Sequence, residues 1–227
     1  MAQSLAWTLS EAWQAQPRTG AGRRAPAADR GVIKSRPAGT DAAEATFAVA
    51  DDATLVAACL AGRPGAFDAI VERHRRAIYQ LCYRFVGNHE DASELSQDVF
   101  LRAYRGLRSF RGGSSLATWL YRIGVNVCLN RVGAKSLATE PLDDRQPIDV
   151  VAEPASERML RAERAARVRA AIAQLPRKQR ATLILRIYHE LSHQEIASVL
   201  GSSVGAVKAN FFHALGNLKK LLGDEIL

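Results

Sequence analysis

Two polar side chains near the C-terminus, Lys208 and Asn210, have the chemistry needed to read the edges of DNA bases. A lysine can donate to guanine or to a phosphate, and an asparagine can pair with adenine through two hydrogen bonds. Both lie early in a predicted helix from Val204 to Leu222. Helices that enter the major groove contact bases with their N-terminal residues, so the spacing predicts a DNA-reading helix.

A shorter helix must hold the reading helix in place, and the preceding residues predict one. Ser192 is a good N-cap, and Glu195, three residues later, completes a capping box. Gly201 stands where the turn between the helices needs a positive φ. A helical hairpin without a role in DNA binding is the alternative. The capping box, the turn glycine and the spacing to Val207 favour a helix-turn-helix instead.

The whole chain is expected to be all-α, with two small helical domains joined by a flexible linker. Apolar residues recur at spacings of three and four, and no segment predicts a strand. The domains are expected at residues 51–132 and 159–227, with the helix-turn-helix in the second. Residues 133–158 hold three prolines and a net charge of −3, which predicts an acidic linker. Residues 1–50, rich in Ala, Gly, Arg and Pro, predict a disordered N-terminal extension.

The composition restricts the possible partners. A net charge of +8 and a pI of about 9.8 indicate an anionic partner. No apolar run reaches the roughly 18 residues of a membrane span, and the N-terminus lacks the basic start of a signal peptide. We therefore expect a cytoplasmic protein without membrane insertion. The three cysteines lack metal-ligand spacing, and there is no phosphate-binding loop or nucleophile–base pair. We expect no metal, no cofactor and no enzymatic activity.

Two separated segments resemble one protein family. One is EDASELSQDVFLRAYRGLRSFRGGSSLATWLYRIGVNVCLNR, at residues 90–131, and the other is LPRKQRATLILRIYHELSHQEIASVLGSSVGAVKANFFHALGNLKKLL, at 175–222. They resemble the N-terminal and C-terminal domains of an extracytoplasmic-function (ECF) sigma factor of bacterial RNA polymerase, in the sigma-70 family. The resemblance implies an initiation factor that binds the clamp and flap of core polymerase and directs it to promoter DNA. It also implies a stress or envelope response and an anti-sigma partner.

The resemblance further implies three sets of site residues. The polymerase would dock on Glu94, Gln97, Asp98, Leu101, Arg102 and Arg105. The promoter −10 element would be unstacked and captured by Phe110, Arg111, Ser114, Ser115, Trp119, Arg122, Asn126 and Asn130. The last four of these follow at spacings of three, four and four, which places them on one helix face. The −35 element would meet Arg177, Arg180, Ser203, Gly205, Ala206, Lys208, Ala209 and Asn210.

The chain departs from the family pattern in the reading helix. Family members commonly have Thr, Ser and Arg where this chain has Ala206, Ala209 and Asn210, so the −35 sequence stays open. Two other functions are also open. A two-component or quorum-type regulator would bind duplex DNA alone, but it would not need the loop and asparagine face near 110–130. An interaction protein resembling an anti-sigma decoy would bind polymerase or a partner without recognising promoters.

Overall fold

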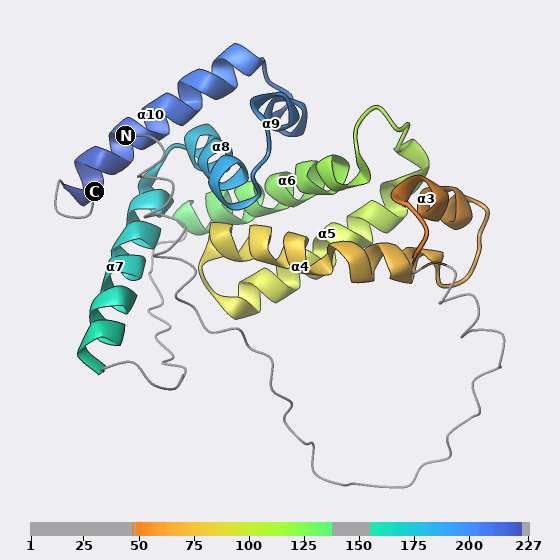
Figure 1. The fold of residues 1–227 in the computed structure, drawn as a ribbon, viewed down its shortest axis with the longest axis horizontal. Coiled ribbons are helices and arrows are strands. Elements are labelled where there is room, and N and C mark those ends of the chain that lie inside the picture. The colour runs from red at the N-terminus through yellow and green to blue at the C-terminus, as the bar shows by residue number, and fades with distance from the viewer. Residues whose placement is uncertain (1–46, 48, 138–154, 224–227) are drawn as a thin grey trace, which may run out of the picture.

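The structure is a computed structural model that describes residue 47 and residues 49–137 and 155–223 (Figure 1). All regular elements in these ranges are helices, which confirms the all-α prediction. None of the described helices combines the length and apolar character needed to cross a membrane. The predicted N-terminal extension falls almost wholly outside the described residues. Most of the predicted linker does too.

The first group of helices forms a bundle around one apolar core. It comprises α3 (Asp52–Leu60), α4 (Ala66–Val86), α5 (His89–Gly106), the short 3-10 helix η1 (Leu107–Ser109) and α6 (Leu116–Leu137). Gly65 and Gly87 flank α4 with φ values of +79° and +80°, so these two glycines set its ends. A Cβ on Gly124 would lie 2.7 Å from Cδ2 of Leu81, and this glycine therefore lets α6 approach α4 closely.

The second group contains α7 (Ala155–Gln174), α8 (Arg177–Tyr188), α9 (His193–Leu200) and α10 (Val204–Leu222). Pro176 precedes α8, where its missing N–H leaves no helix hydrogen bond unmade. The long helix α10 packs against α7, α8 and α9. Figure 1 shows α9 lying over α6, and α8 contacts α4, so the second group rests on the first.

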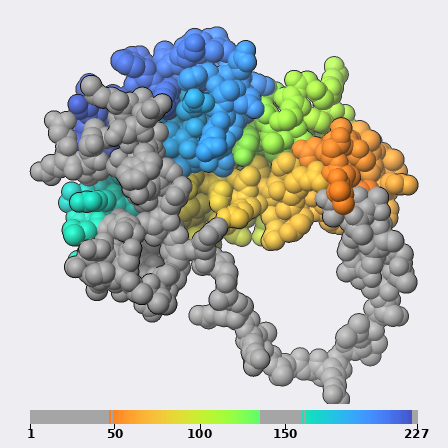
Figure 2. Space-filling view, in the orientation of Figure 1, coloured from red at the N-terminus to blue at the C-terminus, as the bar shows by residue number. Residues whose placement is uncertain are grey.

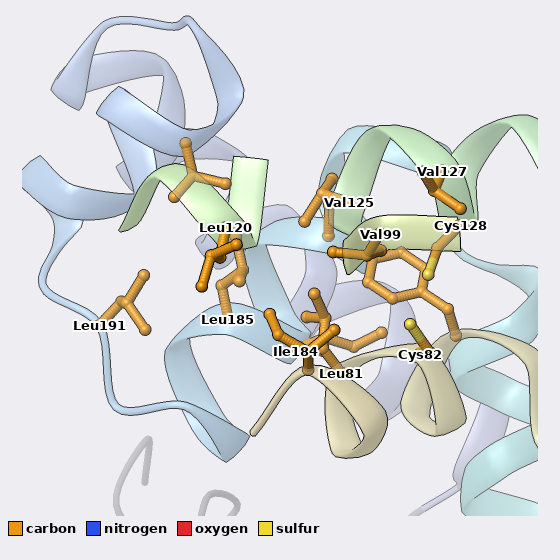
Figure 3. Close-up of a cluster of buried hydrophobic side chains, with 14 of the residues drawn as sticks. Leu81, Cys82, Val99, Leu120, Val125, Val127, Cys128, Ile184, Leu185 and Leu191 are labelled. Carbon is orange, nitrogen blue, oxygen red and sulfur yellow. The ribbon is translucent and has the colours of Figure 1, made fainter. Parts of the chain in front are cut away.

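The two groups of helices share a continuous apolar core. Ile184, Leu185 and Leu191 belong to one cluster with Leu81 and Leu120 of the first group, as Figure 3 shows. In Figure 2 the blue atoms of α8–α10 lie directly against the yellow and green atoms of α4 and α6. The burial of apolar side chains therefore stabilises a closed arrangement of the two domains.

Three predicted boundaries need correction. The first domain was expected to end at residue 132, but its last helix continues to Leu137; the second was expected to begin at residue 159, but its first helix begins at Ala155. The predicted linker 133–158 is therefore helical at both ends, because Ala, Arg, Lys and Glu favour helix even without an apolar face. Phe47 was assigned to the disordered extension, but it is buried in the core, and Ala50 accepts a hydrogen bond from Arg73.

Candidate nucleic-acid interface

The predicted helix-turn-helix is present, with the predicted caps. The backbone N–H of Glu195 donates to Oγ of Ser192 at 3.2 Å, and the N–H of Ser192 donates to Oε2 of Glu195 at 2.8 Å. The Ser192 hydroxyl also donates to Glu195, and these hydrogen bonds lower the pKa of that carboxyl. Gly201 adopts φ +57° at the turn. These contacts fix the start of α9 and the angle at which α10 follows.

The residues predicted to meet the −35 element fall into three environments on α10. Gly205, Lys208 and Ala209 are exposed on its outer face, whereas Ala206 and Asn210 are half-buried. The hydroxyl of Ser203 accepts from the N–H of Ala206 at 3.2 Å and so caps the helix. The outer face of α10 is therefore less polar than the sequence alone indicated.

The loop predicted to capture a base leads into the N-terminus of α6. The rings of Phe110 and Trp119 lie 5.4 Å apart and are both half-buried. Ser115 accepts a hydrogen bond from the N–H of Thr118 at 3.1 Å, so this hydroxyl caps α6. Gly112 adopts φ +70° in an exposed part of the loop. The loop thus combines helix-capping groups with an exposed tip.

The polar face predicted on α6 is only partly available to DNA, because one of its residues contacts the other domain. Asn126 and Asn130 are both exposed, one turn apart, as their spacing predicted. Arg122 lies on the same face, but its guanidinium group contacts the other domain. Its Nε donates to the carbonyl oxygen of Ser198 on α9 at 3.2 Å, and its Nη2 donates to the same oxygen.

The outer face of α5 carries all six residues predicted to dock on polymerase. Asp98 and Arg102 form a two-pronged ion pair, with nitrogen–oxygen distances of 2.8 and 2.9 Å. Glu94 pairs with Arg131 of α6 at 2.6 Å. Leu101 is 56% exposed. Sequence reasoning missed Tyr104, which is 65% exposed although its ring contacts Phe67.

Comparisons with known proteins match each of the two domains seen in the structure to a family model. The family model for sigma-70 region 2 matches residues 70–137, and the model for sigma-70 region 4 matches residues 165–218. The ECF RNA polymerase sigma factor SigM of Mycobacterium tuberculosis is 37% identical over 173 residues, covering 76% of this chain and 85% of SigM. This chain belongs to the ECF sigma factors of the sigma-70 family.

Further relatives agree with this assignment. RNA polymerase sigma-H factor of Pseudomonas aeruginosa is 37% identical, with 75% of this chain and 93% of that protein covered. Among solved structures, CnrH in complex with the cytosolic domain of CnrY matches with a TM-score of 0.57 and 28% identity, over 75% of this chain and 96% of that chain. This sigma factor therefore binds core RNA polymerase and directs it to promoter DNA.

Two arginines of the sigma factor cap helices that belong to the opposite domain. The carbonyl of Ser198 lies in the last turn of α9, where helix carbonyls lack partners within the helix, and Arg122 of α6 donates to it. The carbonyl of Phe85 lies in the last turn of α4, and Arg180 of α8 donates to it. A cation at a helix C-terminus also interacts favourably with the helix dipole.

Arg180 was predicted to meet the −35 element, and the structure places it between the two domains. Its side chain is buried, and its guanidinium group lies 5.7 Å from the centre of the Phe85 ring. A buried side chain cannot reach a phosphate while the domains are closed. Arg177 is exposed, yet its Nη2 donates to the carbonyl of Leu129 on α6. Both arginines of α8 that were predicted to meet the −35 element thus contact the other domain.

Proposed function

We propose that three surfaces of this sigma factor each bind a different partner during transcription initiation. The outer face of α5 docks on the clamp of core polymerase. The loop 110–115 and the exposed side chains of α6 capture unstacked bases of the −10 element, and the outer face of α10 lies in the major groove of the −35 element. The observation that carries this assignment is the exposure of Asn126 and Asn130 on a helix that follows an exposed glycine-containing loop. An asparagine side chain can both donate to and accept from the edge of a base.

The charged pair on α5 supports the docking assignment. Asp98 and Arg102 already satisfy each other and remain partly exposed, so they present a fixed polar pattern beside the apolar Leu101. Interfaces commonly combine such apolar anchors with a polar rim. A charge reversal at Asp98 is therefore expected to weaken core binding without unfolding α5.

We further propose that promoter binding requires the two domains to separate. In the closed arrangement, Arg122 and Arg177 donate to backbone carbonyls of the opposite domain. These guanidinium groups cannot hold both those carbonyls and DNA. Separation frees them, and it also exposes Arg180.

The proposals on catalysis, localisation, response and regulation rest on membership of the ECF family. We propose a non-catalytic initiation factor that acts in the cytoplasm, within a stress or envelope response. CnrH was solved with the cytosolic domain of CnrY, and we propose that this sigma factor is likewise held by an anti-sigma protein. A partner that stabilises the closed arrangement would keep the promoter-binding arginines occupied.

The decisive experiment is transcription in vitro with purified core polymerase. The wild-type chain is expected to yield promoter-specific transcripts whose start sites share −10 and −35 elements. The double variant N126A/N130A should lose at least about tenfold in transcript yield, since each base contact is worth about 1 kcal/mol or more. Its binding to core should be unchanged. The control Gln80→Ala alters an exposed amide on α4 and should transcribe normally. Absence of specific transcripts with the wild-type chain would refute the proposed function.

A further inference from the structure

Two buried thiols, Cys82 and Cys128, face each other across the contact between α4 and α6. Both cysteines are free and fully buried, and Figure 3 shows their sulfur atoms pointing toward one another from the two helices. The Cys128 thiol is hydrogen-bonded to Cys82, and this contact, followed by burial, raises the pKa of Cys128 above its ordinary value. Neither thiol belongs to the polymerase or DNA surfaces proposed above. The proposed function therefore leaves this pair of reactive groups without a role.

The two helices approach each other closely at the level of this pair. Gly124 lies one turn before Cys128 on the same face of α6. A Cβ on this glycine would lie 2.7 Å from Cδ2 of Leu81, the residue next to Cys82. A disulfide requires Cα atoms about 4.4–6.8 Å apart and Cβ atoms that point toward each other. Helices packed through a glycine can meet the first condition, and the facing sulfur atoms agree with the second. The two thiols are thus placed to form a disulfide without unfolding of α4 or α6.

A metal site and plain core packing are the other uses of two adjacent thiols. Structural zinc sites take four ligands, most often from cysteine and histidine. Among the residues that the structure describes, no group of three or more His, Cys, Asp or Glu side chains converges as such a site requires. A free cysteine often packs as a small apolar residue, which accounts for the burial of both side chains. Core packing predicts that oxidation does not link the two thiols, so experiment can separate it from a redox role.

Part of the cover over the pair comes from the other domain. Arg180 of α8 is buried and donates to the carbonyl of Phe85, which lies one turn after Cys82. Its guanidinium group is also near enough to Cys128 for its charge to act on that thiol. Buried cysteines are unreactive because the thiolate, which burial disfavours, is the nucleophile. Separation of the domains withdraws Arg180 and admits water to this part of the contact between α4 and α6. The reactivity of the pair should therefore depend on domain separation.

We propose that Cys82 and Cys128 are a redox-sensitive pair, which a peroxide converts to a disulfide when the two domains separate. One thiol attacks hydrogen peroxide, takes up one oxygen atom as a sulfenic acid, and releases one water. The other thiol attacks the sulfenic sulfur, forms the S–S bond, and gives its proton to the departing hydroxyl group, which leaves as a second water. The two sulfur atoms lose two electrons in all, and a reducing thiol reverses the link by disulfide exchange. The inference rests on the proposed separation of the domains and adds a modification site to it.

The test treats the free chain and promoter-bound holoenzyme with hydrogen peroxide and maps their peptides by mass spectrometry without reductant. The peptides that contain Cys82 and Cys128 should become joined, with the loss of two hydrogen atoms, severalfold faster in the holoenzyme than in the free chain. Dithiothreitol should release them. Cys59→Ala removes the third, half-buried thiol and should give the same linkage. Cys82→Ala should give no linkage, because Cys128 then has no partner within reach.

Three outcomes overturn the inference, and they separate it from the proposed function. If the holoenzyme protects the promoter but both thiols stay reduced while Cys59 is oxidised, the pair is ordinary core packing and the proposed function stands. Equal rates in the free chain and the holoenzyme would show that the second domain does not cover the pair. If the promoter is not protected, the proposed function fails, and long oxidation of the free chain still tests the pair. Rare separations should slowly yield the same linked peptide, and its absence would refute the inference. These comparisons use the wild-type chain, so they do not depend on the folding of a variant.

Discussion

Acidification is expected to separate the two domains, because it charges a half-buried histidine that lies between them. His189 follows α8, and its Nδ1 lies 3.1 Å from the hydroxyl of Tyr121 on α6. The two rings are 4.9 Å apart. Nε2 of His189 is buried and has no hydrogen-bond partner among the described residues. Burial, followed by the charge of nearby Arg84, lowers the pKa of His189 from 6.5 to about 4.

This pKa difference sets the sign and the size of the effect. In the closed arrangement the neutral imidazole is favoured, whereas separation returns the ring to water and to an ordinary pKa. Between pH 6.5 and pH 4 the separated form binds a proton that the closed form does not, so lowering the pH favours separation. From pH 7 to pH 5 the difference is about 2 kcal/mol, which changes the ratio of closed to separated chains roughly 20- to 30-fold. Above pH 7 the ratio should hardly change.

Small-angle scattering can measure the separation as an increase in the radius of gyration between pH 7 and pH 5. His189→Phe fills a similar space, stays neutral and should remain closed at both values. His213→Gln alters an exposed histidine on α10 and should respond like the wild type. An unchanged radius in the wild type, or an equal increase in His189→Phe, would show that this histidine does not hold the domains together.

Three further predictions concern stability and reactivity. Ser192→Ala removes the α9 cap and should lower the free energy of unfolding of the C-terminal domain by about 1 kcal/mol in urea titrations. Gly124→Ala places a Cβ 2.7 Å from Leu81 and should lower the melting temperature, at a cost of about 1–3 kcal/mol, whereas Gly216→Ala should raise it slightly. A maleimide reagent should label Cys59 and leave the two buried thiols unlabelled until denaturant is added, as mass spectrometry would show.

The helices could be predicted because their signals are local. The sequence of residues 66–86 predicts the helix Ala66–Val86, since an apolar period runs between two glycines and both glycines adopt a positive φ. The ends of α6 and α7 could not be placed, because residues 133–137 and 155–158 continue the helices without an apolar face. Most of these residues favour helix by their intrinsic propensity, and a periodicity argument does not detect propensity.

The sequence predicted which polar residues of the candidate site are exposed, but it did not predict which of them contact the other domain. Exposure of Asn126, Asn130 and Lys208 agrees with what their spacing indicated. The role of Arg180 could not be foreseen, because a basic residue in a basic domain equally suits a phosphate and a carbonyl of another helix.

The closed arrangement and the promoter-bound arrangement compete for the same chemical groups. Arg122 satisfies an unpaired carbonyl at the end of α9, and a guanidinium hydrogen bond of this kind is worth about 1.5–3 kcal/mol. DNA phosphate offers the same group a similar interaction, so the exchange of partners is nearly balanced. The apolar core shared by α4, α6 and α8 then decides which arrangement prevails in the free chain. Apparent promoter affinity falls with the fraction of chains that are closed, so variants that weaken this core should bind promoters more readily.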